Sequence, residues 1–107
     1  MYSNDYTFYI YTVKTLPEFD KWLNNLKDHI TRLRLSRRLD KAQHGNLGDV
    51  KPVGEGVFEM REYFGPGWRM YYVKRGKTLI VMLGGGDKGS QENDIAKAKQ
   101  REATLED

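Results

Sequence analysis

The residues of this chain whose types and spacing could do chemistry are concentrated between Gly56 and Val81. This segment carries five cationic side chains: Arg61, Arg69, Lys74, Arg75 and Lys77. Its residue pattern predicts three short strands, joined by turns at Gly65-Pro66-Gly67 and at Arg75-Gly76, the second a two-residue hairpin turn. A small antiparallel sheet that presents arginines and tyrosines on one face suits binding to a phosphate backbone.

The two central arginines each have more than one interpretation. Arg61 shares a strand face with Glu59, while Phe58 and Met60 are expected to be buried on the opposite face. Arg61 is therefore either part of a surface cross-strand ion pair, which contributes little, or a guanidinium that contacts phosphate in a fork geometry. Arg69 follows the glycine-rich turn, where it is a surface arginine, an arginine stacked on a neighbouring ring, or a phosphate ligand.

Three further residues outside this segment are candidates for binding or proton transfer. Lys88 lies in a glycine-rich loop directly before the last expected helix, where backbone N–H groups attract anions. The alternative is an ordinary solvated loop lysine, and the loop lacks the Gly-Lys-Ser/Thr ending of a Walker sequence. Lys51 is a free-standing cation in the arm before the sheet. His44 could act as a general acid or base, although it has no partner at a telling spacing.

Composition bounds the possible functions. The 107 residues suit a single domain, and the net charge of +3 permits an anionic partner without proving one. The chain has no cysteine and only two histidines, without metal-ligand spacing, so we expect neither a metal nor another cofactor. The amino-terminal residues do not have the pattern of a signal peptide, and no window approaches a membrane span. We therefore expect a cytoplasmic protein without a membrane partner.

The first half of the chain predicts one strand and two helices. Alternating aromatic and β-branched residues predict a strand over Tyr6–Val13. A helix is expected to start after Thr15, with Thr15 as its N-cap and Pro17 in its first turn. A second helix over Asp28–Ala42 would form an antiparallel hairpin with the first. Five cations are expected on its surface, a pattern more typical of a solvated face than of a nucleic-acid patch: Arg32, Arg34, Arg37, Arg38 and Lys41.

The second half predicts a sheet and a final helix. Val50–Val53 is expected to be a brief strand or an extended arm, and the three-stranded meander follows. The apolar run Leu79–Leu83 is typical of a central strand buried on both faces. The chain is then expected to leave the sheet at Gly84, and Ser90 to cap a helix that runs to about Ala103. We predict an α+β fold in which the helical hairpin covers one face of a twisted, mainly antiparallel sheet and the other face is open.

Three segments together carry a resemblance to a known family. They are FDKWLNNLKD, GNLGDVKPVGEGVFEMREYFGPGWRMYYV and LIVMLGGGDKGSQENDIAKA, and they span residues 19–98. On these motifs the chain resembles the RelE/ParE toxin superfamily of bacterial toxin–antitoxin modules. It resembles more closely the HigB-like branch of addiction module killer proteins. The resemblance implies a compact toxin domain over residues 1–107, with an amino-terminal strand, a helical hairpin on a twisted sheet, and a carboxy-terminal helix.

The resemblance also implies a reaction and residues for it. RelE-like members enter the ribosomal A site and cut mRNA without a metal, by attack of a ribose 2′-hydroxyl on the adjacent phosphate. Position by position, Arg69 matches the arginine of a Gly-aromatic-Arg motif, Arg61 a basic strand residue, and Lys88 a basic residue after the last strand. These three are the expected catalytic residues. Four more are expected to contact the RNA: Lys51, Lys74, Arg75 and Lys77.

The chain departs from the family pattern at several positions, and two activities stay open. Glu59 stands where RelE has a second lysine, and the last helix has no tyrosine. The implied partners are a helix-turn-helix antitoxin of the HigA-like kind, the ribosome and mRNA. ParE-like toxins share the fold but inhibit DNA gyrase, and fold alone does not separate the two activities. A gyrase inhibitor or a phage-related growth-inhibition module is therefore the alternative.

Overall fold

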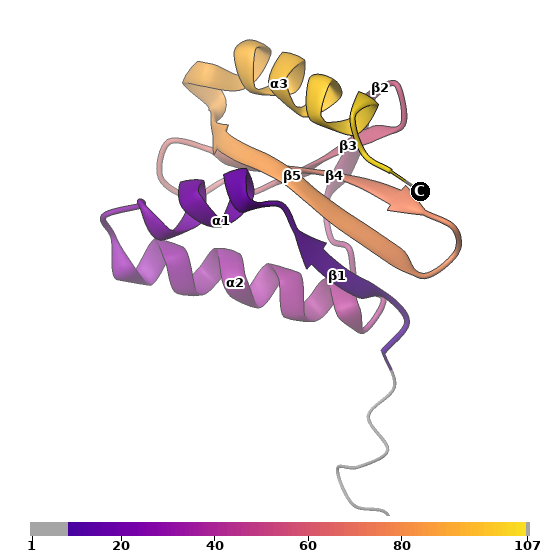
Figure 1. Cartoon of the computed structure of the whole chain (residues 1–107). Helices are drawn as coiled ribbons and strands as arrows, with labels where there is room; N and C mark the ends of the chain where they lie inside the picture. Colours follow the sequence, from indigo (N-terminus) through magenta and orange to yellow (C-terminus); the bar gives the residue numbers. More distant parts are fainter. Residues whose placement is uncertain (1–8, 107) are drawn as a thin grey trace, which may run out of the picture.

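The computed structural model describes residues 9–106 and confirms an α+β architecture (Figure 1). The elements follow one another as β1 (Thr12–Thr15), α1 (Pro17–Asn24), α2 (His29–Gln43), β2 (Val50–Gly54), β3 (Val57–Arg61), β4 (Trp68–Arg75), β5 (Leu79–Asp87), the 3-10 turn η2 (Lys88–Ser90) and α3 (Gln91–Ala103). Within residues 9–106, no helix has the length and apolar character needed to span a membrane.

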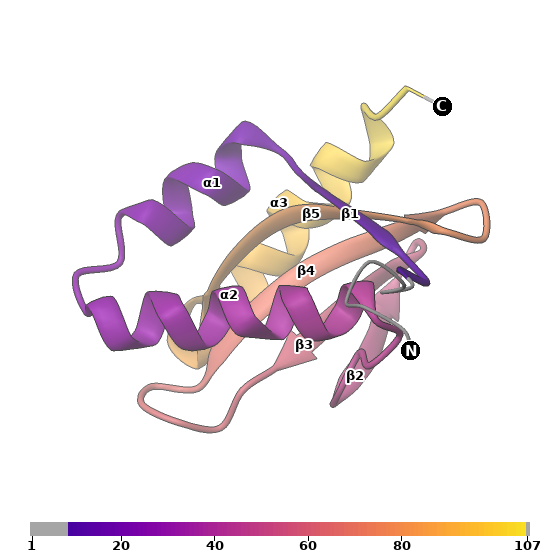
Figure 2. The ribbon, with the colours of Figure 1, turned by 90° about the horizontal axis from the view of Figure 1, so that it is seen from below.

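The five strands form one sheet in the order β1-β5-β4-β3-β2. Strand β1 runs parallel to β5, and all other neighbours are antiparallel, as a mainly antiparallel sheet requires. Helices α1 and α2 lie on one face and α3 lies on the other (Figures 1 and 2). The prediction of an open second face is therefore wrong, because α3 packs against β5, β4 and β3.

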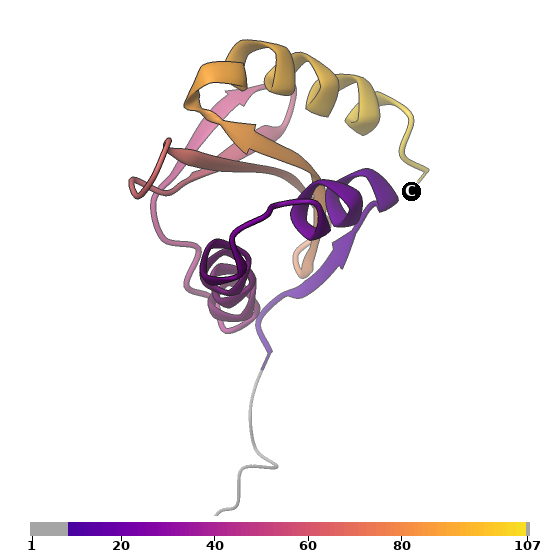
Figure 3. The ribbon, with the colours of Figure 1, turned by 90° about the vertical axis from the view of Figure 1, so that its left-hand side faces the viewer.

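Each face of the sheet has its own apolar core. The core under α1 and α2 consists of Phe19, Leu35, Ala42, Met60, Met70, Tyr72, Ile80 and Met82. The core under α3 consists of Val57, Tyr71, Val73, Val81, Leu83 and Ala98. Because side chains alternate along a strand, consecutive residues of β4 and β5 enter opposite cores. This confirms the prediction that the apolar run of β5 is buried on both faces. Figure 3 shows the sheet with α3 on one side and α1 and α2 on the other.

The glycine run after Leu83 remains in the sheet, contrary to the prediction that the chain leaves it at Gly84. Gly86 pairs with Arg69, and pairing continues to the end of β5. Side chains from both faces explain why glycine is needed here. A β-carbon on Gly85 would collide with the ring of Trp22 in α1, and one on Gly86 would collide with the carboxylate of Asp94 in α3. The missing side chains let both helices pack closely on β5.

The start of the chain differs from the prediction. Strand β1 covers Thr12–Thr15 instead of residues 6–13, of which 6–8 lie outside the described residues. The backbone N–H groups of Ile10 and Tyr11 bond to the carbonyl of Gln43 at 2.7 and 3.1 Å, so these residues pair with the end of α2 and not with the sheet. Thr15 ends β1, and Leu16 is the N-cap of α1; the prediction of Thr15 as the cap is wrong.

The starts of the two helices α1 and α2 agree with the prediction more closely, whereas the β4–β5 hairpin does not. Pro17 occupies the first turn of α1. Asp28 caps α2, where its carboxylate accepts from the N–H of Ile30 at 3.2 Å and from the hydroxyl of Thr31 at 2.8 Å. The β4–β5 hairpin is longer than predicted: the end of β4 pairs with Leu79, which leaves residues 76–78 as a three-residue loop.

Candidate functional site

One end of the sheet brings the three predicted catalytic residues together. Arg61 at the end of β3 pairs with Arg69 near the start of β4. Arg69 also pairs with Gly86 of β5, and Lys88 lies two residues after Gly86, directly beyond the end of the strand. The turn between β3 and β4 closes the cluster. A β-carbon placed on Gly67 would lie 3.4 Å from Cβ of Lys88 and 3.6 Å from Nη1 of Arg69. The ends of three strands therefore converge on one small cationic cluster, which we call the sheet cluster: Arg61, Tyr63, Arg69 and Lys88.

Arg69 is a buried residue, which excludes the interpretation that it is a surface arginine. Its exposed fraction is 6%, and its Nη1 donates to the carbonyls of Glu62 at 3.2 Å and Trp68 at 3.1 Å. Its Nε lies 3.7 Å from Oε1 of Glu59, which is fully buried. The other carboxylate oxygen of Glu59 accepts from Nε2 of Gln91 in α3 at 2.8 Å. Glu59 and Gln91 thus position the arginine, and among the described residues its Nη2 makes no hydrogen bond.

Tyr63 and Asp49 contact arginines of the sheet cluster, and the sequence did not predict them as candidates. Tyr63 lies in the β3–β4 connection with 70% of its surface exposed. Its ring centre is 5.9 Å from the guanidinium carbon of Arg61 and 5.8 Å from that of Arg69. Its hydroxyl donates to Asp49, which also accepts from Nη2 of Arg61 at 3.2 Å. The available signal was an aromatic residue two positions after Arg61, inside a polar turn.

Hydrogen bonding fixes the protonation states of this group. The bond from Tyr63, followed by the bond from Arg61, holds the pKa of Asp49 below its ordinary value. The same bond to Asp49 raises the pKa of Tyr63, and it is the bond to Asp49 that most raises the pKa of Arg61. At neutral pH, Asp49 is therefore ionised, Tyr63 carries its proton and Arg61 is charged. The arrangement offers cations and a hydroxyl donor, with no group among these three that titrates near neutrality.

Arg38 holds the backbone that positions Asp49 and Arg61. It was expected on the surface of the second helix, but its exposed fraction is 8%. Its guanidinium donates to the carbonyls of Leu47 at 2.9 Å, Asp49 at 2.8 Å and Arg61 at 2.9 Å, and it pairs with the carboxylate of Glu62. Because three backbone carbonyls and one carboxylate accept from this side chain, its role is structural: it ties the loop before β2 to the end of β3.

The predicted RNA-contacting residues are divided between two ends of the sheet. Lys51 is exposed and pairs with Glu59 across β2 and β3, so it lies on the face of the sheet cluster, one strand farther out. Lys74 and Arg75 lie at the opposite end of β4, and Lys77 lies in the loop that follows it. Lys74, the first of the three along the chain, is about 17 Å from Arg69 along the strand at ~3.3 Å per residue.

These three residues make local contacts instead. Lys74 donates to the hydroxyl of Tyr11 at 3.2 Å, and Arg75 pairs with Glu102 of α3 at 2.8 Å. Lys77 lies in the exposed hairpin loop. His44, the candidate acid or base, caps the end of α2 with its Nδ1 2.9 Å from the carbonyl of Asp40. The structure therefore brings neither these three cations nor His44 to the sheet cluster.

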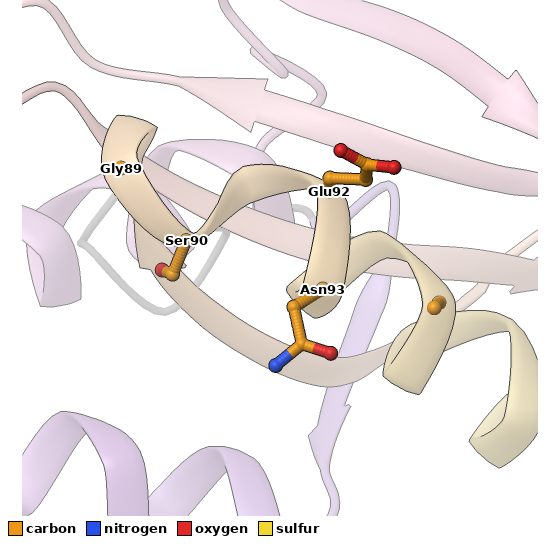
Figure 4. Close-up of a pocket in the computed structure, with 5 residues that line it drawn as sticks. Gly89, Ser90, Glu92 and Asn93 are labelled. Atoms are coloured by element: carbon orange, nitrogen blue, oxygen red, sulfur yellow. The ribbon is translucent and has the colours of Figure 1, made fainter.

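The start of α3 carries an open hollow of about 440 Å³ (Figure 4). Its lining is polar but not cationic: Gly89, Ser90, Glu92, Asn93 and Ala96. The hydroxyl of Ser90 is engaged with the carboxylates of Asp87 and Asp94. These carboxylates oppose binding of an anion at this position. Among residues 9–106, no three His, Cys, Asp or Glu side chains form a group that could hold a metal ion.

Comparison with solved structures identifies the fold. A mutant of the E. coli toxin RelE in the free state superposes with a TM-score of 0.69 at 14% identity, over 90% of this chain and 99% of that chain. The toxin–antitoxin complex RelBE2 from Mycobacterium tuberculosis contains a chain that superposes with a TM-score of 0.57 at 22% identity, over 73% of this chain and 98% of that chain. The fold is therefore that of RelE-type toxins.

Comparison of sequences identifies the family. An uncharacterized protein of Haemophilus influenzae is 40% identical over 87 residues, which cover 81% of this chain and 88% of that protein. The model of the family described as phage derived protein Gp49-like (DUF891) matches residues 21–103, which include α2, every strand from β2 to β5, and α3. The chain belongs to this phage-derived, Gp49-like family.

Proposed function

We propose that this chain is the toxin of a type II toxin–antitoxin module, of the HigB-like kind, that cuts mRNA on the ribosome and so stops translation and growth. The observation that carries this proposal is the sheet cluster at one end of a RelE-like sheet. Cations placed around a reacting phosphate stabilise the charge that develops on it. An exposed aromatic ring beside them gives a nucleobase a surface on which to stack.

In the proposed reaction, the attacking hydroxyl and the phosphate that it attacks both belong to the RNA. The ribose 2′-oxygen forms a bond to the adjacent phosphorus while the bond to the 5′-oxygen breaks, and the 2′-proton leaves as the 5′-oxygen gains one. Arg61 and Lys88 would contact the non-bridging oxygens, because both are accessible to solvent. Arg69, which Glu59 holds in place, would donate from its unpaired Nη2 to the same phosphate.

Dependence on the ribosome follows from what the cluster lacks. The pKa of Asp49 is lowered and the pKa of Tyr63 is raised by the hydrogen bond between them, so both move away from neutral pH. The sheet cluster also contains no histidine. Such a site stabilises charge but is poorly equipped to move protons or to hold a flexible RNA in line for attack. We expect the translating ribosome to orient the mRNA.

Primer extension tests the proposed function. Pure protein is added to an mRNA in a reconstituted translation system and, in parallel, to the same transcript without ribosomes. We expect cuts in the translated mRNA and little cleavage of the naked transcript. Rapid cleavage of the naked transcript would remove the ribosome from the mechanism. No cleavage in either reaction, together with inhibition of supercoiling by purified DNA gyrase, would favour the alternative activity.

The proposed partners are mRNA, the ribosome and a co-encoded helix-turn-helix antitoxin of the HigA-like kind, all in the cytoplasm. One of the structurally similar proteins was solved as a toxin–antitoxin complex, which supports an antitoxin in general. Strand β2 lies at the edge of the sheet and has one side on which a partner strand could pair. Co-expression of the neighbouring gene, followed by pull-down, tests this partner.

Tyr63→Ala is expected to lower mRNA cleavage on the ribosome about tenfold to hundredfold, because base stacking on an aromatic side chain contributes about 1–3 kcal/mol. Tyr63→Phe is the matched control: it keeps the ring and removes only the hydrogen bond to Asp49. We expect Tyr63→Phe to retain most of the activity. Equal losses in the two variants would show that the hydroxyl, and not the ring, is what the reaction uses. Cleavage rates are compared at equal amounts of folded protein.

A further inference from the structure

Helix α2 and the β3–β4 connection enclose a second cationic feature, separate from the sheet cluster. It is a pocket of about 200 Å³ lined by Arg34, Arg37, Arg38, Lys41 and Glu62. Four of the five lining side chains are cations. Arg61 follows Met60, which is buried in the core under α1 and α2, so strand alternation places its side chain on the α3 side of the sheet. The side chain of Glu62 reaches Arg38 of α2, and this pocket and the sheet cluster therefore lie on opposite sides of the end of β3.

The single carboxylate of the pocket is already neutralised. Glu62 pairs with Arg38, whose guanidinium is also occupied by three backbone carbonyls. These two residues are therefore already paired with each other and with the backbone. The three remaining cations, Arg34, Arg37 and Lys41, are exposed, and within residues 9–106 none of them forms an ion pair. The pocket therefore has an uncompensated charge of about +3, which attracts an anion from solution.

The geometry of the three free cations favours an extended polyanion over a single small ion. They occupy positions i, i+3 and i+7 of α2, so they lie along one side of the helix over a length of about 10 Å. The guanidinium of Arg34 is held 3.6 Å from the ring centre of Phe64, which limits its freedom and leaves a planar cation at the surface. Arginine planes of this kind stack on nucleobases and bind phosphate in a fork geometry.

We propose that Arg34, Arg37 and Lys41 form a second nucleic-acid site, which binds successive backbone phosphates of an RNA segment distinct from the phosphate at the sheet cluster. The choice of RNA rests on the proposed function. The site contributes affinity and orientation and takes no part in bond cleavage, because its cations lie on the other side of β3 from the reacting phosphate. An RNA that fills both sites crosses the segment from Arg61 to Phe64.

Binding of RNA tests this site. Fluorescence anisotropy measures the affinity of the protein for a labelled single-stranded RNA of about 20 nucleotides at several salt concentrations. The test variant is Arg34→Gln/Arg37→Gln/Lys41→Gln. The matched control, Lys14→Gln/Lys21→Gln/Lys27→Gln, removes the same charge from exposed residues on β1, on α1 and after α1. We expect the test variant to bind at least tenfold more weakly. We expect its salt slope to fall by about 0.7 for each lost phosphate contact. The control should stay within about threefold of the unmodified chain.

A second variant guards against a loss of folding. Arg37→Glu/Lys41→Glu leaves the contact between Arg34 and Phe64 in place and should weaken RNA binding at least as much. Equal binding by the test and control variants would overturn the proposal. So would an unchanged affinity for RNA with a lost affinity for the antitoxin, which would assign the pocket to a protein partner. A DNA of the same sequence is the second arm: tighter binding of DNA than of RNA through these cations would overturn the choice of RNA.

The outcome is separable from that of the proposed function. Ribosomal mRNA cleavage without any contribution of the pocket to RNA binding would overturn this inference alone. RNA binding at the pocket without ribosomal cleavage would overturn the proposed activity and leave the pocket as an RNA site.

Discussion

Arg61→Ala should abolish growth inhibition and lower mRNA cleavage on the ribosome about a hundredfold to a thousandfold, while the protein stays folded. Removing one donor that stabilises developing charge in a transition state typically has an effect of this size, about 3–4 kcal/mol. The folded state loses little, because the ion pair with Asp49 involves side chains that are 30% and 40% exposed, and exposed pairs contribute little to stability.

Two control variants sharpen this prediction. Lys21→Ala removes one exposed cation from α1 and should leave growth inhibition unchanged. Arg61→Lys keeps the charge but not the fork geometry, and we expect an intermediate rate. Growth is followed after brief induction, cleavage by primer extension, and folding by circular dichroism. An Arg61→Ala protein that is folded and still fully toxic would remove Arg61 from the site, whatever the role of its neighbours.

The parts of the fold that local patterns determine were predictable from the sequence. Asp28 caps α2 because its short carboxylate reaches the free N–H groups of the first turn, and this signal is local. The strands of the meander follow from residue alternation and from glycine turns. The proximity of Arg61 and Arg69 was also predictable, because they lie at the two strand ends that one turn of the meander joins. The position of Lys88 was not, because it depends on the extension of β5 through the glycine run to Asp87.

The parts that depend on contacts between distant residues were not predictable. Helix α3 has few apolar residues, so it did not indicate a second core. It packs closely because Ala98 is small and because β5 carries glycines where α3 approaches. The burial of Arg38 depends on carbonyl groups that only the folded loop supplies. The pairing of Tyr63 with Asp49 joins residues 14 positions apart and requires the register between β2 and β3.

Glu59→Ala should destabilise the protein by about 3–5 kcal/mol, which makes it the substitution with the largest expected effect on stability. Glu59 is fully buried, and its removal leaves the buried guanidinium of Arg69 without the carboxylate 3.7 Å away. Breaking a buried charge pair from one side typically has a cost of this size, because the remaining charge is uncompensated. Gln91 loses its acceptor as well. Urea unfolding with linear extrapolation measures the change in the free energy of unfolding.

The double variant Glu59→Leu/Arg69→Met separates the structural role of the pair from its chemical role. Replacing both partners by apolar side chains of similar volume removes the uncompensated charge, so we expect stability to return to within about 1–2 kcal/mol of the unmodified chain. We expect no recovery of mRNA cleavage, because the guanidinium at the phosphate is gone. A Glu59→Ala protein that unfolds at the same urea concentration as the unmodified chain would show that water or another group compensates Arg69. A double variant that cuts mRNA normally would show that Arg69 supports the fold and not the reaction.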